Sequence, residues 1–458
     1  MRFFTLLLVS ATFITMPVMA QPAGNETLPL ELVLKNTYLD NPRLKSARSE
    51  FKSVVEQLPQ ALAGYRPTIT ADASVTQISV DEDPGTEEDN LAKEFGVVLS
   101  EPLYRGGRTV ASTSQARELI KAQEWDLATT EQSVLLSAVQ VYLNVLRDRS
   151  LLQLAEKNRE TIAKELEATD ARFEVGELTK TDTSQARARL SDAEANVTSA
   201  RGNLKSSEAS FREITGMRVE KLAFPTQYPF SIPESLDSAV QNTLAGNTSL
   251  KTATHVHQAA KAGIGAISGA LLPEVALVGS LGQSYDPGLG TIDEERSAAI
   301  GIQAVMPLYE AGSTRSRVRE SKYVANQRFY DVLDAERQVR DQIISAWEDY
   351  RASQANIVSR RAQVDANRVA REGVLEESRV GERTVLDVLD AERELLDAEV
   401  GLVTAQRDAI FAAYQLAAIA GELTPETLGF AELKLDTAKI VNEAEDKWFS
   451  TAIEDDVR

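Results

Sequence analysis

The chain has 458 residues, a formal net charge of −20 and no cysteine. The lack of cysteine excludes disulfide bonds and thiolate metal sites, and the strong negative charge disfavours nucleic acid and anionic membrane surfaces as partners. Hydrophobic residues make up 43% and charged residues 26% of the chain, which is ordinary for a folded protein.

Residues 1–20 have the pattern of a secretory signal peptide. Arg2 gives a basic start, an apolar stretch begins at Phe3, and small residues lead to Ala20. We expect cleavage before Gln21 and export of the mature chain. An amino-terminal membrane anchor is the alternative, and it fits less well because the apolar stretch is short and interrupted. No later stretch is apolar enough for a transmembrane helix.

The remaining chain contains two copies of one unit. The string PLYRGG at residues 102–107 returns as PLYEAG at residues 307–312. The offset of about 205 residues indicates a duplicated large unit, because solenoid repeats have periods of only a few tens of residues. We assign residues 21–225 to the first repeat and residues 226–430 to the second.

A strand hairpin is predicted in each repeat, over residues 67–104 and 273–309. Apolar residues such as Ile69, Ala71 and Ala73 alternate with polar ones there. Alternation over about ten residues per strand is typical of outer-membrane barrel strands. A solvent-facing antiparallel hairpin alternates in the same way and is the alternative.

Four strands in one chain cannot close a membrane barrel, which needs at least about eight. Several copies of the chain would therefore have to share one barrel. A dimer would supply eight strands and a trimer twelve, and the strand pattern alone does not choose between them.

A very long helix is predicted after each hairpin, over residues 108–174 and 313–379. Residues 108–174 contain neither proline nor glycine, and a helix of this length spans roughly 100 Å. Apolar residues recur every seven positions in two rows, which is a coiled-coil seam. We expect Pro102 and Pro307 to end the strands. The expected strand-to-helix turns contain three glycines, Gly106, Gly107 and Gly312.

Each long helix runs into a similar turn, VGELT at residues 175–179 and VGERT at residues 380–384. Gly176 and Gly381 can supply the left-handed backbone that closes a helix. The threonine that ends each turn can cap a returning helix, so each turn is predicted to be the tip of a helical hairpin. The returning helices are expected over two ranges, residues 179–215 and 384–420.

The order, spacing and duplication of these elements resemble the TolC family of outer-membrane efflux proteins over about residues 28–430. The resemblance implies a mainly α fold with a minor β part. Three chains would form a twelve-stranded β-barrel in the outer membrane that continues into an α-barrel in the periplasm. The implied function is the exit duct of a tripartite efflux pump or type I secretion system. The implied partners are a periplasmic adaptor protein, an inner-membrane transporter and outer membrane lipid.

The resemblance also implies a pore constriction on the helix after the second tip. The segment at residues 380–390 matches the family pattern, and it places Asp387 and Asp390 on one helical face. Three chains would then set six carboxylates around an axis, which favours cations and could hold a divalent ion. The alternative is that Asp387 caps its helix, as Asp182 can in the first repeat. Asp390 has Gln185 as its repeat counterpart.

Arg383 is expected to link the two tips. In the family such an arginine ties the second tip to the first, and Thr181 and Asp182 are the matching acceptors. Its repeat counterpart is Leu178, so the charge is specific to the second tip. An exposed arginine in a turn is the alternative. The chain has Ser378 where the family's best-known pattern has a tyrosine, and this departure concerns one of the links that hold the closed state.

The sequence suggests no catalytic, cofactor or metal site. The only two histidines, His255 and His257, point in different directions on a predicted helix. We therefore predict that the protein is not an enzyme. A periplasmic adaptor and a coiled-coil structural protein of the cell envelope are the alternative functions, and the matched strand hairpins argue against both. The charged tail at residues 431–458 either wraps the middle of the tunnel or is disordered.

Overall fold

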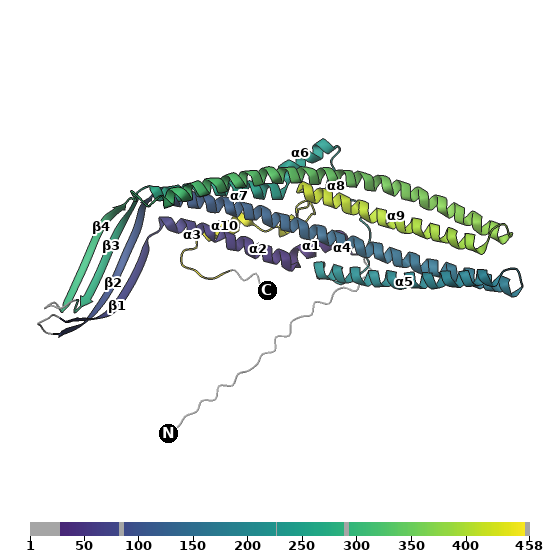
Figure 1. The fold of residues 1–458 in the computed structure, drawn as a ribbon, viewed down its shortest axis with the longest axis horizontal. Helices are drawn as coiled ribbons and strands as arrows, with labels where there is room; N and C mark the ends of the chain where they lie inside the picture. The colour runs from purple at the N-terminus through teal and green to yellow at the C-terminus, as the bar shows by residue number, and fades with distance from the viewer. Residues whose placement is uncertain (1–27, 82–86, 226, 288–292, 454–458) are drawn as a thin grey trace, which may run out of the picture.

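The computed structural model describes residues 28–81, 87–225, 227–287 and 293–453. The expected signal peptide lies outside these residues. The described chain is a long rod with a sheet at one end and two helical tips at the other (Figure 1). No helix among the described residues is long and apolar enough to cross a membrane.

Four antiparallel strands form one sheet in the order β1-β2-β3-β4. Their bounds are β1 Thr68–Asp81, β2 Glu87–Arg105, β3 Glu274–Tyr285 and β4 Glu294–Val305. The strands of the first repeat have 14 and 19 residues and so exceed the length expected from the alternation. The expectation that Pro102 ends a strand is wrong. A register shift between Pro102 and Tyr104 accommodates the missing N–H group, so that β2 continues to Arg105.

The two long helices are α4 Arg108–Glu174 and α8 Ser313–Arg379, which have 67 residues each. Each returns as a shorter helix of 36 residues, α5 Lys180–Thr215 and α9 Val385–Ala420. The bounds of the long helices match the expected ranges, since glycine turns stop the chain on both sides. The two hairpins α4–α5 and α8–α9 lie together in the half of the rod that ends at the tips (Figure 1).

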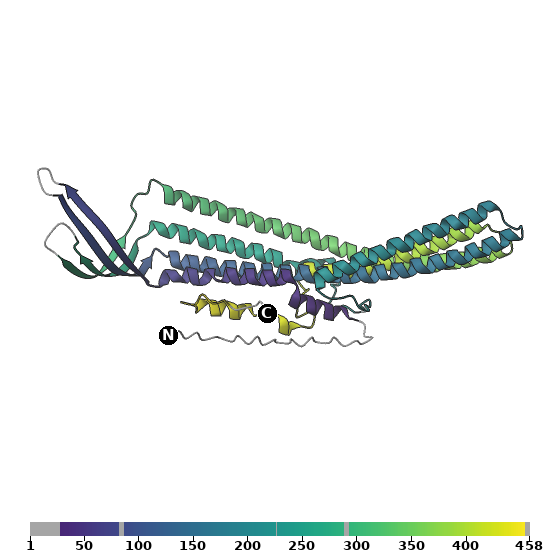
Figure 2. The same ribbon diagram turned by 90° about the horizontal axis from the view of Figure 1, so that it is seen from below.

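Shorter helices cover the long ones in the half of the rod next to the sheet. α7 lies between α4 and α8, and α2 and α3 lie along the other side of α4 (Figure 2). The shorter helices are α1 Leu30–Asp40, α2 Pro42–Val55, α3 Gln57–Leu62, α6 Leu236–Gly246, α7 Thr248–Ser268 and α10 Thr437–Glu445. The described residues also form the 3-10 turns η1 Ala63–Tyr65, η2 Gly269–Leu271 and η3 Ala431–Leu433.

The largest apolar core lies in the middle of the rod, where the connection between the repeats crosses α4. Tyr142 of α4 is fully buried there. Its hydroxyl oxygen lies 3.0 Å from the carbonyl oxygen of Leu28 and 2.8 Å from that of Ala223, so its one proton can be donated to either. Burial raises the pKa of Tyr142, so the group stays a neutral donor. One side chain thus ties both ends of the first repeat to its long helix.

The described tail, residues 431–453, packs against the first repeat. Ala444 of α10 is buried in an apolar cluster with Phe51 and Val55 of α2 and Leu58 of α3. The Thr437 hydroxyl donates to Glu124 of α4 at 2.6 Å. The sequence left two possibilities for the tail, packing against the rod and disorder. These described residues pack against the rod.

A buried carboxylate lies beside the central core. Glu131 of α4 is 8% exposed and accepts a hydrogen bond of 2.7 Å from the hydroxyl of Tyr38 in α1. The Arg48 guanidinium lies 4.5 Å from the centre of the Tyr38 ring. Burial raises the pKa of the Glu131 carboxyl, because a charged form is poorly solvated there.

We expect Glu131→Gln to keep the Tyr38 hydrogen bond and remove the buried charge. Because the folded-state pKa of Glu131 is raised, its contribution to stability is present at acidic pH and is lost as the pH rises through that pKa. The difference in melting temperature between the variant and the unmodified protein should therefore shift in favour of the variant as the pH rises above about 4.5, the ordinary pKa of a glutamate. Glu131→Ala leaves the Tyr38 hydroxyl unpaired and should lose about 1–3 kcal/mol. Thermal unfolding measures both variants, and a Gln effect that does not change with pH would contradict this expectation.

Candidate functional site

The two tips have the same backbone geometry. Gly176 and Gly381 have φ values of 80° and 85°, the left-handed region that favours glycine. After each glycine the chain closes the long helix with a pair of hydrogen bonds. Glu177 N–H donates to Arg172 O and Glu382 N–H donates to Glu377 O, both at 3.0 Å. Each tip is therefore a tight and well-defined reversal.

A threonine and an aspartate cap each returning helix. Thr384 N–H donates to Asp387 Oδ2 at 2.9 Å, and Asp387 N–H donates to the Thr384 hydroxyl oxygen at 3.2 Å. Thr179 and Asp182 form the same reciprocal pair in the first repeat. The Thr384 backbone N–H holds the pKa of Asp387 below its usual range, and the Thr179 N–H does so for Asp182. The contacts that Asp387 makes are therefore those of a helix cap, which was the alternative interpretation of this residue. A carboxylate in such a cap remains charged.

Asp390 makes a different contact. Its Oδ1 accepts a hydrogen bond of 2.6 Å from Arg189, an ion pair that joins α9 to α5. About half of the Asp390 carboxylate remains exposed. Arg189 was not among the residues predicted from the sequence. Its repeat counterpart is Glu394, so the repeat carries no sign of this contact between α5 and α9.

Arg383 is bound across its own turn. Its Nε donates to Glu377 at 2.9 Å. Thr181 is exposed at the start of α5, and Asp182 is held by Thr179. Among the described contacts of the single chain none joins Arg383 to Thr181 or Asp182. The link between the tips through these residues stays a prediction.

Apolar and charged side chains hold the two hairpins together behind the tips. Ile162, Ala186, Val385 and Leu389 form a buried cluster contributed by α4, α5 and α9. Nearby, Arg371 of α8 pairs with the buried Glu392 of α9. Burial and then the charge of Glu392 raise the pKa of Glu165 on α4. The tip end of the rod therefore depends on contacts between the repeats as well as within them.

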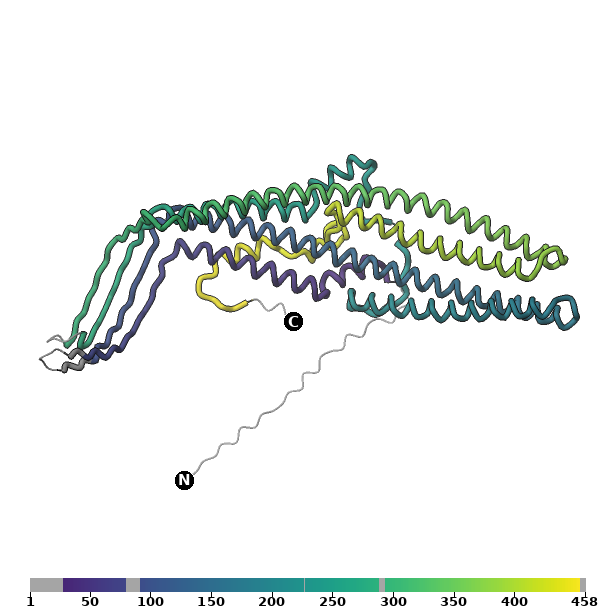
Figure 3. Tube along the Cα trace, viewed as in Figure 1, coloured from purple at the N-terminus to yellow at the C-terminus, as the bar shows by residue number. Residues whose placement is uncertain are grey.

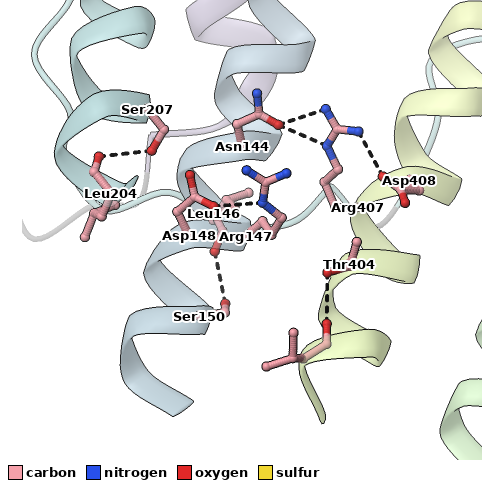
Figure 4. Close-up of polar contacts among 11 residues, drawn as sticks. Asn144, Leu146, Arg147, Asp148, Ser150, Leu204, Ser207, Thr404, Arg407 and Asp408 are labelled. Carbon is pink, nitrogen blue, oxygen red and sulfur yellow. Dashed lines mark hydrogen bonds and ion pairs between the residues drawn. The ribbon is translucent and has the colours of Figure 1, made fainter. Parts of the chain in front are cut away.

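A second polar link joins the repeats near the middle of the rod. Arg407 reaches from α9 to Asn144 on α4, and its Nε and Nη2 donate to Asn144 Oδ1 at 3.1 and 2.8 Å (Figure 4). Its Nη1 donates to Asp408 at 2.9 Å. The repeat counterpart of Arg407 is Gly202, which has no side chain. The first repeat therefore has no arginine at the equivalent position that could form such a link.

The turns between the strands and the long helices use glycine with positive φ. Gly106, Gly107 and Gly312 have φ values of 60°, 74° and 81°. A Cβ atom on Gly106 would lie 2.2 Å from the carbonyl oxygen of Gly269. The first repeat therefore needs glycine at residue 106 for close packing as well as for its conformation.

The described residues contain no cluster of three or more side chains suited to a metal ion. Both histidines instead hold α7 in place. His255 Nδ1 lies 2.7 Å from Glu118 of α4, and His257 Nδ1 lies 3.1 Å from the carbonyl oxygen of Ala325 in α8.

The sequence model of the outer membrane efflux protein family matches the chain twice, over residues 33–217 and 239–422. The chain belongs to the outer membrane efflux protein family. Each match covers one repeat, from the helices before the hairpin to the end of the returning helix. The family consists of outer membrane channels and not of enzymes. Membership confirms the expected relation to TolC, the location in the outer membrane and the prediction that the protein is not an enzyme.

Similar proteins of this family are known in several bacteria. The outer membrane efflux protein BepC of Brucella suis is 32% identical over 443 residues, which cover 96% of this chain and 94% of BepC. The outer membrane protein TolC of Vibrio cholerae is 28% identical over 414 residues, covering 87% and 92% of the two chains. The crystal structure of the Campylobacter jejuni CmeC outer membrane channel superposes with a TM-score of 0.78 at 18% identity, covering 96% and 98%. This likeness confirms the mainly helical fold with a minor β part.

We expect Thr384→Val to loosen the start of α9, because it removes the hydroxyl that accepts from Asp387 N–H. Amide hydrogen exchange in the first turn of α9 should become severalfold faster. Thr179→Val is the matched variant and should do the same in α5 alone. Thr384→Ser keeps the hydroxyl and should restore slow exchange. Equal exchange in the Val and Ser variants would show that the cap does not hold this helix end.

Proposed function

We propose that the protein is a trimeric channel in the outer membrane and the exit duct of a tripartite efflux pump or type I secretion system. A periplasmic adaptor protein and an inner-membrane transporter would deliver its cargo. Family membership supports the channel function and disfavours the alternatives of adaptor and structural coiled-coil protein.

The sheet carries the argument for a shared barrel. Within the part of the chain that the structure describes, β1 and β4 each have a strand neighbour on one side only, and every residue of β4 is exposed. Unpaired edges of this length invite pairing with another chain. Pairing of β4 in one copy with β1 in the next would close a ring, and three copies would contribute twelve strands, within the range of membrane barrels.

One face of the sheet is suited to lipid. The register places Ile69 opposite Leu99, Leu99 opposite Gly279, and Gly279 opposite Ile300. Every second residue along each strand lies on this same face. On β4 these include Ile300 and Ile302, whose side chains are 80% and 71% exposed. Gly279 has no side chain, and the exposed apolar residue of β3 on this face is Leu281, two residues further along. Exposed apolar side chains on this face of all four strands fit the lipid-facing band of an outer-membrane sheet.

We further propose that Asp387 and Asp390 line a constriction at the tips. Arg189 belongs to the same group of charges, since it pairs with Asp390. Two carboxylates and one guanidinium leave each chain with a single formal negative charge there. The ring would therefore favour cations less strongly than six unpaired carboxylates would, and Arg189 would set the degree of that preference.

The test is single-channel conductance of the purified protein in a planar lipid bilayer. We expect a small cation-selective conductance. Asp387→Asn combined with Asp390→Asn should abolish or reverse the cation preference, because Arg189 remains, and Arg189→Gln should increase it. Asp182→Asn removes a cap of the same kind in the first repeat and controls for loss of a cap. Unchanged selectivity in the double variant would exclude the aspartate constriction, and a folded protein that does not conduct would exclude the channel.

A further inference from the structure

The described tail carries an exposed aromatic pair after α10. Trp448 is 59% and Phe449 is 94% exposed, and their ring centres lie 6.4 Å apart. Nothing in the repeats corresponds to this pair, and neither the aspartate constriction nor the shared barrel uses it. Adjacent exposed aromatic side chains in an ordered segment indicate an interaction surface.

Arg66 fixes this pair beside the base of the sheet. Its guanidinium carbon lies 4.1 Å from the centre of the Trp448 ring, and its Nη2 donates to the carbonyl oxygen of Glu445 at 3.3 Å. Arg66 lies two residues before Thr68, where β1 begins. The yellow tail accordingly passes under the sheet end of the purple helices (Figure 3).

The tail is held there firmly. Arg117 of α4 pairs with Glu445 at 3.2 Å, and Ala444 is buried against α2 and α3. Trp448 follows these anchored residues closely. Trp448 is therefore positioned before any ligand binds, which lowers the entropic cost of binding a ligand or surface.

The level of the pair along the rod matches the start of the apolar row on the sheet. Ile69 is the first exposed apolar residue of β1, and it lies three residues after Arg66, or about 10 Å in an extended strand. Trp and Tyr side chains concentrate where acyl chains give way to headgroups, because their rings are both apolar and polar. Tyr65 is half exposed beside Arg66, and the arginine supplies a cation for lipid phosphate.

We propose that Tyr65, Arg66, Trp448 and Phe449 form a phospholipid-binding patch, the tail patch, that rests in the headgroup layer on the periplasmic side of the outer membrane. This inference rests on the proposed function, since it requires the sheet to span the membrane. The aromatic rings would lie among the upper acyl carbons, and Arg66 would face the phosphate. The tail would thus bind the helical rod to the membrane outside the barrel itself.

Tryptophan fluorescence tests the tail patch. The chain has 3 tryptophans, and the variant with Trp125→Phe and Trp347→Phe retains Trp448 alone. The full-length variant is reconstituted into phosphatidylcholine vesicles that carry bromine either high or low on the acyl chain. We expect the high bromine to quench Trp448 by about half, and more strongly than the low bromine, because interfacial rings lie near the headgroups. A variant with Trp125→Phe and Trp448→Phe retains the buried Trp347 and should not be quenched.

A reporter on the sheet separates this inference from the proposed function. Ile300→Trp in a background with the three native tryptophans changed to Phe should be quenched if the sheet spans the bilayer. Quenching at residue 300 with Trp448 open to aqueous iodide would overturn the tail patch and leave the channel standing. Trp448 shielded from both lipid and iodide would place it against a second copy and also overturn the patch. No quenching at either position would overturn both proposals.

Discussion

Two helices of 67 residues must be covered along their whole length, and the rest of the structure follows from this constraint. A helix gains most of its stability from packing of its apolar face and little from its own hydrogen bonds. For α4 the cover comes from α2, α3 and α7 near the sheet and from α5 and α9 near the tips. The helices that pack against α4 change at the central core. There Tyr142 also binds the connection between the repeats.

The two repeats share a backbone plan and differ in the polar contacts that join them. Both tips use the same reciprocal threonine and aspartate cap. In contrast, Asp390, Arg383 and Arg407 are charged where the first repeat has Gln185, Leu178 and Gly202. Two of these charges make contacts that cross between the repeats, Asp390 with Arg189 and Arg407 with Asn144. The second repeat therefore carries much of the chemistry that fixes one hairpin against the other.

Backbone signals in the sequence were sufficient to predict the helical hairpins. Gly176 and Gly381 mark the tips because few other residues adopt positive φ. Pro102 was misleading because a register shift allows a proline within the strand. The contact of Arg189 with Asp390 was not predictable, since it depends on how α5 and α9 face each other. For the tail the sequence left packing and disorder both open, because its apolar contact residues are scattered among charges.

The equal lengths of corresponding helices have a consequence for how such a chain can evolve. The long helices have 67 residues each and the returning helices 36 each, although the side chains of the repeats have diverged. Seven residues inserted into one long helix alone would push one tip about 10 Å beyond the other. Both hairpins would have to lengthen together to stay level. The length of the rod can therefore change in evolution only when both hairpins gain or lose the same number of residues.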